Sequence, residues 1–469
     1  MSAPLWTWEE LVAAAEGRAD GLPQDAITGF SNDSRGLQAG DVFVALKDRR
    51  DGHDFVNGAF ASGAAAALVQ ADYAKQPGDG ALLRVDDPQR ALERIGIAAR
   101  ARLKVSARVI AVTGSVGKTG TKEMLRACLE PLGKVHASEK SFNNHFGVPL
   151  TLARMPRDTQ FGVFEIGMNH ADEIRPLAKM VRPHAALITT VEAVHLENFA
   201  SVEAIADAKA EIFDGVLSHG AAIIKHDNPY RERLIAAAKK LGLIVKTFGF
   251  GSDAGALIRE LVVKDDGSDL KVSIGEKRFA GHLGIPGVHI AENLVGVIAT
   301  LDAIGVDAAH ALEPLANLKP PHGRGARVLL AVGGGQAMLI DESYNANPAS
   351  MKMSLATLGT VPRQKYARRI AVLGDMLELG PEAAKMHAGL KGAVDDAGVD
   401  LVFACGPLMK SLYDALEPER QGYYAAKARD LETAVITALR AGDVIMVKGS
   451  NGVRLGPLAA TIGAHFPPA

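Results

Sequence analysis

This chain of 469 residues contains few cysteines and few aromatic residues, and its positive and negative charges nearly balance. Only Cys128 and Cys405 are cysteines, so neither a disulfide framework nor a cysteine-based zinc site is expected. Aromatic residues make up 5%, which argues against an aromatic platform for single-stranded nucleic acid. The formal net charge is −2, so no surface built to coat nucleic acid or an anionic membrane is predicted.

Long apolar runs are absent as well. No stretch approaches the roughly 20 apolar residues that a membrane-spanning helix needs. The segment from Met1 to Glu10 has neither a basic start nor an apolar core, so no signal peptide is predicted. We therefore expect a cytoplasmic α/β protein that neither inserts into a membrane nor binds nucleic acid. A monomer is expected as well.

The most informative segment that is present spans residues 114–119, Gly-Ser-Val-Gly-Lys-Thr. It follows an apolar run, 108–113, and precedes a helix-like segment, 122–129, which is the order of a phosphate-binding loop. Backbone N–H groups and the helix N-terminus attract the anion, the lysine reaches the β- and γ-phosphates, and the threonine binds Mg²⁺. The usual first glycine is replaced by Val112, so a plain glycine turn at a helix N-terminus is the alternative.

The alternation of strand-like and helix-like segments predicts the fold class. Strand candidates recur at 108–113, 161–165, 185–189 and 221–224, with helix-like segments between them. This pattern is typical of a parallel sheet with crossover helices. Around residues 270–274 it changes to short alternating strands, which predict an antiparallel appendage to that sheet.

Three α/β domains are therefore expected. Residues 1–106 are predicted to form a small N-terminal α/β domain, and residues 107–318 a central domain whose doubly wound, mainly parallel sheet carries the phosphate loop. The proline-rich piece 318–325 is predicted to be a linker and hinge. Residues 319–469 contain further buried-strand candidates and predict a C-terminal Rossmann-like domain without a phosphate loop of its own.

Several polar residues follow predicted strands, at the edge where ligands bind in open α/β sheets. Glu165 ends one strand candidate, where a carboxylate can hold an Mg²⁺ that bridges nucleotide phosphates. His195 follows the next strand candidate; a lone histidine is more often structural, but two such residues beside one phosphate loop favour a site. Lys209 lies in a helix-like segment, where a lysine is usually a solvated surface residue.

Other polar loops carry weaker signals. The turn Asp33-Ser34-Arg35 presents an arginine that can fork onto a carboxylate or phosphate. Residues 142–149 form an amide-rich loop, and residues 344–348 follow the strand candidate 337–341. Residues 448–452 end the last strand candidate and can meet an anion through nested amides. None of these loops identifies a ligand by itself.

Taken in order, these segments resemble the muramyl peptide ligases, and the resemblance covers nearly the whole chain. Residues 32–35, 40–46 and 51–55 are similar to the UDP-sugar-binding domain of that family. Four more segments resemble the members that attach a dipeptide: 142–151, 195–199, 341–348 and 373–380. The resemblance implies an ATP-dependent ligase that adds D-alanyl-D-alanine to UDP-N-acetylmuramoyl-tripeptide through an acyl phosphate, releasing ADP and phosphate and yielding the pentapeptide precursor of peptidoglycan.

The resemblance also implies roles for individual residues. For ATP, it implies the phosphate loop, two residues near the adenine and four residues on the C-terminal side: Gly114, Ser115, Gly117, Lys118, Thr119 and Gly120; His289 and Asn293; Arg324, Asp341, Asn345 and Asn347. For substrate, it implies Asp33, Ser34, Arg35, Asn143 and Asn144. For Mg²⁺, it implies Thr119, Glu165, His195 and Lys209, the last as a carbamate formed with CO₂. Lys118, Lys209 and His195 are then the catalytic residues.

Two positions depart from the family pattern, and two other functions stay open. Gly120 stands where a second threonine or serine is usual, so one phosphate contact is expected to be missing, and Val116 replaces a more common polar or small residue. One alternative is a ligase that adds a single amino acid, as a muramyl dipeptide ligase or folylpolyglutamate synthase does. The other is a non-catalytic P-loop switch, which the lack of an Asn-Lys-x-Asp guanine-reading motif disfavours.

Overall fold

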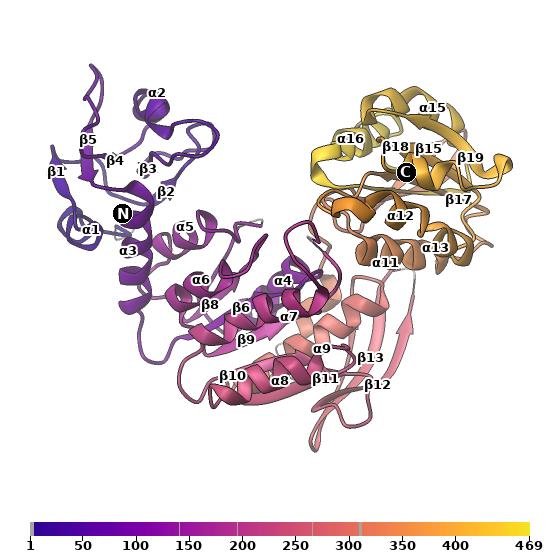
Figure 1. The fold of residues 1–469 in the computed structure, drawn as a ribbon, viewed down its shortest axis with the longest axis horizontal. Coiled ribbons are helices and arrows are strands. Elements are labelled where there is room, and N and C mark those ends of the chain that lie inside the picture. The colour runs from indigo at the N-terminus through magenta and orange to yellow at the C-terminus, as the bar shows by residue number, and fades with distance from the viewer. Residues whose placement is uncertain (1–3, 140, 195, 265, 309–311) are drawn as a thin grey trace.

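Three β-sheets follow one another along the chain. The structure is a computed structural model that describes residues 4–139, 141–194, 196–264, 266–308 and 312–469. Figure 1 shows the N-terminal sheet in indigo and violet and the C-terminal sheet in orange to yellow on opposite sides of the central sheet. The expected α/β class with three domains is confirmed, whereas the boundaries after residues 106 and 318 stay predictions.

The N-terminal sheet has five strands in the order β1-β5-β4-β3-β2, parallel except for β1. Its helices begin with clear sequence signals: Asp87 caps α3 by accepting the N–H groups of Gln89 and Arg90, and Pro88 occupies the first helical position. The elements are α1 (Trp8–Ala15), β1 (Arg18–Asp20), β2 (Gly29–Ser31), β3 (Asp41–Val44), α2 (Val56–Ala61), β4 (Ala66–Gln70), β5 (Ala81–Val85) and α3 (Pro88–Ala101).

The central sheet has nine strands in the order β14-β13-β12-β11-β10-β9-β6-β8-β7. Strands β6 to β12 are parallel, and β12, β13 and β14 form the expected antiparallel appendage, which is therefore confirmed. The strands are β6 (Arg108–Thr113), β7 (Val135–Ala137), β8 (Phe161–Glu165), β9 (Ala185–Ile188), β10 (Ala221–Lys225), β11 (Ile244–Gly249), β12 (Ala256–Val263), β13 (Ser268–Ile274) and β14 (Lys277–Leu283).

Helices cover both faces of the central sheet. Leu125 of α4 and Leu294 of α9 belong to the apolar core on one face, and α5, α6, α7 and α8 pack on the other. Of these, α5 also joins the core of the N-terminal sheet through Leu150 and Ala153. The helices are α4 (Lys118–Leu129), α5 (Gly147–Ala153), α6 (Ile174–Val181), α7 (Val202–Ala210), α8 (Arg231–Lys240) and α9 (Val288–Ala303).

The C-terminal sheet has six strands in the order β15-β16-β20-β17-β18-β19, with β15 antiparallel and the rest parallel. The last strand of the chain, β20, therefore lies between β16 and β17. The strands are β15 (Ala326–Val332), β16 (Gly335–Glu342), β17 (Arg368–Gly374), β18 (Leu401–Cys405), β19 (Gln421–Ala425) and β20 (Asp443–Lys448). The helices are α11 (Pro348–Gly359), α12 (Ala383–Ala388), α13 (Lys391–Asp396), α14 (Lys410–Tyr413), α15 (Glu432–Ala438) and α16 (Leu455–His465).

Short 3₁₀ turns connect several of these elements, and no helix in the described ranges has the length and apolar character needed to cross a bilayer. The 3₁₀ turns are η1 (Gly52–Phe55), η2 (Glu130–Leu132), η3 (Glu211–Gly215), η4 (Glu313–Asn317), η5 (Gly380–Glu382), η6 (Pro418–Arg420), η7 (Ala428–Leu431) and η8 (Asn451–Val453).

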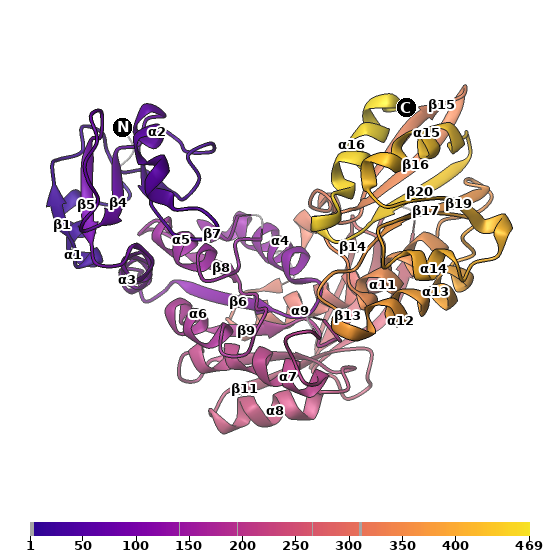
Figure 2. The same cartoon turned by 45° about the horizontal axis from the view of Figure 1, so that its top comes forward.

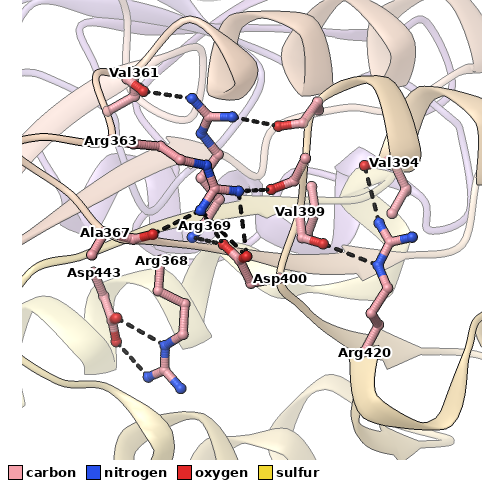
Figure 3. A network of polar contacts seen from close by, with 12 residues as sticks. Val361, Arg363, Ala367, Arg368, Arg369, Val394, Val399, Asp400, Arg420 and Asp443 are labelled. Atoms are coloured by element: carbon pink, nitrogen blue, oxygen red, sulfur yellow. Dashed lines mark hydrogen bonds and ion pairs between the residues drawn. The ribbon is translucent and has the colours of Figure 1, made fainter.

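Arginines hold the amino ends of the strands in the C-terminal sheet (Figure 3). Arg363 pairs with Asp400, and Arg369 donates to backbone carbonyls that follow α11 and α13. Arg368 donates two hydrogen bonds, of 2.9 and 2.7 Å, to the Asp443 carboxylate. Asp443 is 3% exposed, so this bidentate pair is largely shielded from water and fixes the start of β17 against that of β20.

Replacing Asp443 is expected to destabilise the C-terminal sheet. In Asp443→Ala, the partly buried Arg368 and the N–H of Arg440 both lose an acceptor, which should cost about 2 kcal/mol of unfolding free energy. Calorimetric unfolding of the whole chain measures this. Asp414→Ala is the matched control, because its carboxylate pairs with Lys410 on the surface and its loss should leave the transition unchanged. Equal shifts in both variants would contradict the assigned importance of the Arg368 pair.

Candidate active site

The phosphate loop connects β6 to α4, as the sequence predicts. Two of its glycines are required by close approach and by positive φ angles. A Cβ on Gly114 (φ 148°) would lie 1.9 Å from the Thr189 hydroxyl oxygen, and one on Gly117 (φ 85°) would lie 2.4 Å from the side-chain nitrogen of Asn293. The loop is thus packed against the end of β9 on one side and against α9 on the other.

Side chains fix the conformation of this loop. The Ser115 hydroxyl donates to the Glu192 carbonyl at 3.1 Å and accepts the Glu192 N–H at 2.9 Å. Lys118 donates to the Gly114 carbonyl at 2.7 Å, so its ammonium lies over the loop. Burial lowers the pKa of Lys118, and Arg324 lowers it further, although Glu165 acts in the opposite direction.

Oxygen donors gather beside the first turn of α4. The Thr119 hydroxyl donates to one oxygen of Glu165 at 2.8 Å, and the Asn143 amide donates to the other at 2.7 Å. Ser141 lies 3.3 Å from the Thr119 hydroxyl and accepts a hydrogen bond of 3.1 Å from Arg324. The Glu165 carboxylate is 1% exposed. A buried carboxylate with hydroxyl oxygens next to a phosphate loop is a donor set that suits Mg²⁺.

A pocket of about 240 Å³ lies between the central and C-terminal sheets. Figures 1 and 2 both place the C-terminal sheet next to the α4 and α9 end of the central sheet. Most residues expected to contact ATP or Mg²⁺ line this pocket: Ser115, Gly117, Lys118, Thr119, Gly120, Glu165, His289, Asn293, Arg324, Asn345 and Asn347. Asn143, which was expected to bind the substrate, lines it as well. The structure therefore brings together segments that lie as far apart in the sequence as Ser115 and Asn347.

Other predicted site residues do not line the pocket. Gly114 forms the base of the loop, and Asp341 is 8% exposed and accepts the N–H and hydroxyl of Ser343. Asn144 accepts the N–H groups of Phe146 and Gly147, so it shapes the start of α5. The pocket is thus formed around the phosphate loop without direct contributions from these three predicted residues.

Lys209 is buried and does not line the pocket. It is 2% exposed on α7, and among the described residues its amino group has no hydrogen-bond or salt-bridge partner. Burial and the positive charge of Lys118 lower its pKa well below the usual value. The structure thus contradicts the solvated-lysine interpretation. His195 lies outside the described residues, and the remainder contain no cluster of three metal-ligating side chains.

The predicted substrate residues of the N-terminal sheet lie apart from the pocket. Arg35 holds the Asp33 carboxylate with hydrogen bonds of 2.9 and 2.7 Å, which keeps the pKa of Asp33 at about 2. The Arg35 side chain is 81% exposed. Asp33, Ser34 and Arg35 follow the carboxyl end of β2, where the arginine fork pairs with a neighbouring carboxylate.

Among the pocket residues given no individual role from the sequence are Glu342 and Lys448, although the sequence predicts that the segment 448–452 can meet an anion. Lys448, at the end of β20, donates to the Asn345 carbonyl at 3.0 Å and lies 3.5 Å from Glu342. Burial lowers the pKa of Lys448. Arg324 stacks over the Tyr344 ring, with 4.2 Å between the guanidinium carbon and the ring centroid. The position of Glu342 and Lys448 at strand ends was the available signal, because the carboxyl ends of parallel strands face one ligand crevice.

Gly120 and Gly117 should respond in opposite ways to substitution by alanine. No atom lies within 4 Å of a Cβ built on Gly120, so Gly120→Ala should stabilise α4 by up to about 1 kcal/mol through helix propensity. Gly117→Ala should lower stability, because its φ of 85° and the contact with Asn293 both oppose a side chain. Thermal unfolding of the two variants beside the parent measures this. A gain for Gly117→Ala would contradict the loop geometry.

The comparisons with known proteins identify the family of this chain. The family model of the Mur ligase middle domain matches residues 112–301, and that of the "Mur ligase, glutamate ligase domain" matches residues 327–451. The UDP-N-acetylmuramoyl-tripeptide--D-alanyl-D-alanine ligase of Rickettsia prowazekii is 33% identical over 424 residues, covering 90% of this chain and 92% of that protein. The ligase of the same name from Bacillus subtilis is 33% identical over 438 residues, with 92% of each chain covered.

A solved structure of the same kind of ligase is similar to this chain over nearly its whole length. The crystal structure of MurF from Acinetobacter baumannii has a TM-score of 0.85 and 28% sequence identity, and the match covers 98% of this chain and 99% of that one. The resemblance noted in the motifs is confirmed: this chain belongs to the Mur ligase family.

Proposed function

We propose that this chain is an ATP-dependent ligase that joins D-alanyl-D-alanine to UDP-N-acetylmuramoyl-tripeptide. The observation that carries the proposal is the pocket in which Lys118, Thr119 and Glu165 of the central sheet meet Asn345 and Lys448 of the C-terminal sheet. The Rickettsia and Bacillus relatives carry this activity in their names and align over at least 90% of the chain. These names favour the dipeptide-adding ligase over the single-residue ligase and the nucleotide switch.

The proposed reaction has two steps. A carboxylate oxygen of the tripeptide attacks the γ-phosphorus of ATP. The bond between this phosphorus and the bridging oxygen breaks, ADP departs, and the tripeptide becomes an acyl phosphate. The amine of D-alanyl-D-alanine then attacks the acyl carbon, the carbon–oxygen bond breaks, phosphate leaves and the nitrogen loses a proton. Phosphoryl transfer depends on positioning and charge neutralisation, which the N–H groups of the loop and the ammonium of Lys118 provide.

The oxygen donors beside α4 fit a magnesium ion. Thr119 and Glu165 would hold it, and Asn143 keeps Glu165 oriented through its 2.7 Å hydrogen bond. When bound there, Mg²⁺ would neutralise negative charge on the phosphates. Because the carboxylate is already buried between Thr119 and Asn143, little side-chain movement is needed to present it.

We also propose that Lys209 carries a carbamate that, with His195, holds a second Mg²⁺. A neutral amine attacks CO₂ and loses a proton to give a carbamate anion. Burial beside Lys118 favours the neutral amine of Lys209, and the resulting anion would balance the charge of Lys118. This chemistry gives a function to a buried lysine that lacks a salt-bridge partner among the described residues.

The remaining expectations complete the proposal. Asp33, Ser34 and Arg35 would bind the UDP-sugar end of the substrate, and Asn143 and Asn144 would also contact the substrate. His289 and Asn293 would lie near the adenine. Arg324, in the hinge, and Asp341, in β16, would close the C-terminal sheet on the nucleotide and exclude water, because acyl phosphates hydrolyse. The proposed enzyme is a cytoplasmic monomer.

A measurement of the phosphate released from ATP in the presence of Mg²⁺ tests the proposal. This release should depend on both UDP-N-acetylmuramoyl-tripeptide and D-alanyl-D-alanine, and mass spectrometry should find the pentapeptide product. D-Alanine alone should not replace the dipeptide. Phosphate release that ignores both substrates would contradict the ligase and leave a bare ATPase or switch.

In the same assay Lys118→Ala should lower turnover by at least about 100-fold, because the loop loses its phosphate-binding ammonium. Its unfolding temperature should stay that of the parent. Lys134→Ala, which removes a surface lysine paired with Asp158, is the control and should keep full turnover. Wild-type turnover in folded Lys118→Ala would contradict the role given to this lysine.

Lys209→Ala tests the carbamate. The variant should be inactive, and a short-chain carboxylate such as acetate should restore part of the activity by supplying the missing anion. Lys240→Ala, on the exposed side of α8, should behave like the parent with and without acetate. Wild-type activity in Lys209→Ala would exclude a carbamate function.

A further inference from the structure

The end of β20 holds two consecutive carbonyl groups of the pocket loop that follows β16. Lys448 donates to the Asn345 carbonyl at 3.0 Å, and the Ser450 hydroxyl donates to the Ala346 carbonyl at 3.2 Å. The side chains of Asn345 and Asn347 on either side line the pocket. The segment after β20 therefore sets the backbone from which these two amides reach the proposed nucleotide.

Ser450 also binds a second loop. Its hydroxyl oxygen accepts the Leu377 N–H at 3.0 Å, and its own N–H donates to the Asp375 carbonyl at 3.0 Å. A hydroxyl has one proton and two lone pairs, so it can donate to Ala346 and accept from Leu377 at the same time. Ser450 is 5% exposed, so water cannot readily replace it. This hydroxyl joins the loop after β16 to the loop after β17.

The loop after β17 is fixed at its root. The Asp375 carboxylate accepts the Met409 N–H at 2.7 Å. The fully buried ring of His387 accepts the Met376 N–H at 2.8 Å through Nε2. Its Nδ1 therefore carries the proton and donates to the Ala383 carbonyl at 2.6 Å. Two buried side chains thus fix residues 375 and 376, directly before the Leu377 N–H that Ser450 accepts.

The tip of the same loop reaches the central sheet. Gly380 has a φ of 66°, and a Cβ built on it would lie 3.4 Å from the Cα of Glu197, in the segment that follows β9. The loop from Asp375 to Gly380 is thus an arm of the C-terminal sheet that lies against the segment after β9, outside the hinge.

We propose that Ser450 is a positioning residue that couples this arm to the pocket loop, so that contact between the two sheets sets the placement of Asn345 at ATP. The inference rests on the proposed function. The effect falls on Asn345, because Asn347 is held separately by its capping box with Ser350, whereas the Asn345 side chain is exposed. Ser450 itself does not line the pocket and acts through the Ala346 carbonyl.

Steady-state kinetics of Ser450→Ala test the coupling. Loss of one hydrogen bond to the pocket loop should raise KM for ATP about fivefold and weaken direct binding of a fluorescent ADP analogue equally. KM for UDP-N-acetylmuramoyl-tripeptide should not change, since its proposed UDP-binding residues lie on the N-terminal sheet. Ser450→Thr keeps the hydroxyl and should restore the ATP values. Ser411→Ala, on α14 and away from the pocket, is the control.

A double variant separates coupling from a general loss of structure. If Ser450 acts through Asn345, then Ser450→Ala should have no further effect on KM for ATP in an Asn345→Ala background. Additive effects, or equal changes in all KM values, would overturn the inference. So would unchanged ADP-analogue binding in Ser450→Ala. If the parent chain lacks dipeptide-dependent phosphate release, the proposed function fails instead, and analogue binding still reports on the coupling.

Discussion

The contact between the Thr119 hydroxyl and the Glu165 carboxylate, at 2.8 Å, is the constraint on which the site depends. It exists because β6 and β8 are parallel neighbours whose register places Glu165 opposite Val112, directly before the phosphate loop. A slip of one residue would turn the carboxylate to the other face of the sheet. The metal donor set, the orientation of Asn143 and the link through Ser141 to Arg324 all follow from this register.

Local patterns were sufficient to predict the centre of the molecule. The apolar runs at 108–113, 161–165 and 185–189 correspond to buried parallel strands, and the phosphate loop lies where its glycines and flanking segments predict. Elements with weaker patterns were missed. β15 is an antiparallel edge strand with mostly half-buried and exposed residues, and β19 is an edge strand that is only partly buried. Side chains of edge strands are less completely buried than those of central strands, so the hydrophobicity of their sequence alone does not reveal them.

The sequence predicted many of the residues that form the site, but it did not predict which hydrogen-bond partners their side chains have. Strand-end logic located Glu165, but it did not reveal that Asp341 turns toward Ser343 or that Arg35 pairs with Asp33. These choices depend on neighbours a few residues away, which compete with any ligand for the same donors and acceptors. The burial of Lys209 depends on the packing of α7 against the central sheet, and an isolated helix pattern contains no such information.

The order of strands in the C-terminal sheet has a consequence for synthesis of the chain. β16 and β17 are both hydrogen-bonded to β20, which is translated about a hundred residues after β16. Until β20 leaves the ribosome, each of these buried strands has an unpaired edge, which makes the nascent chain a substrate for chaperones and prone to aggregation. The same late segment delivers Lys448 and Ser450. A prematurely terminated chain would therefore lack a competent nucleotide pocket, and quality control could recognise it by its open sheet.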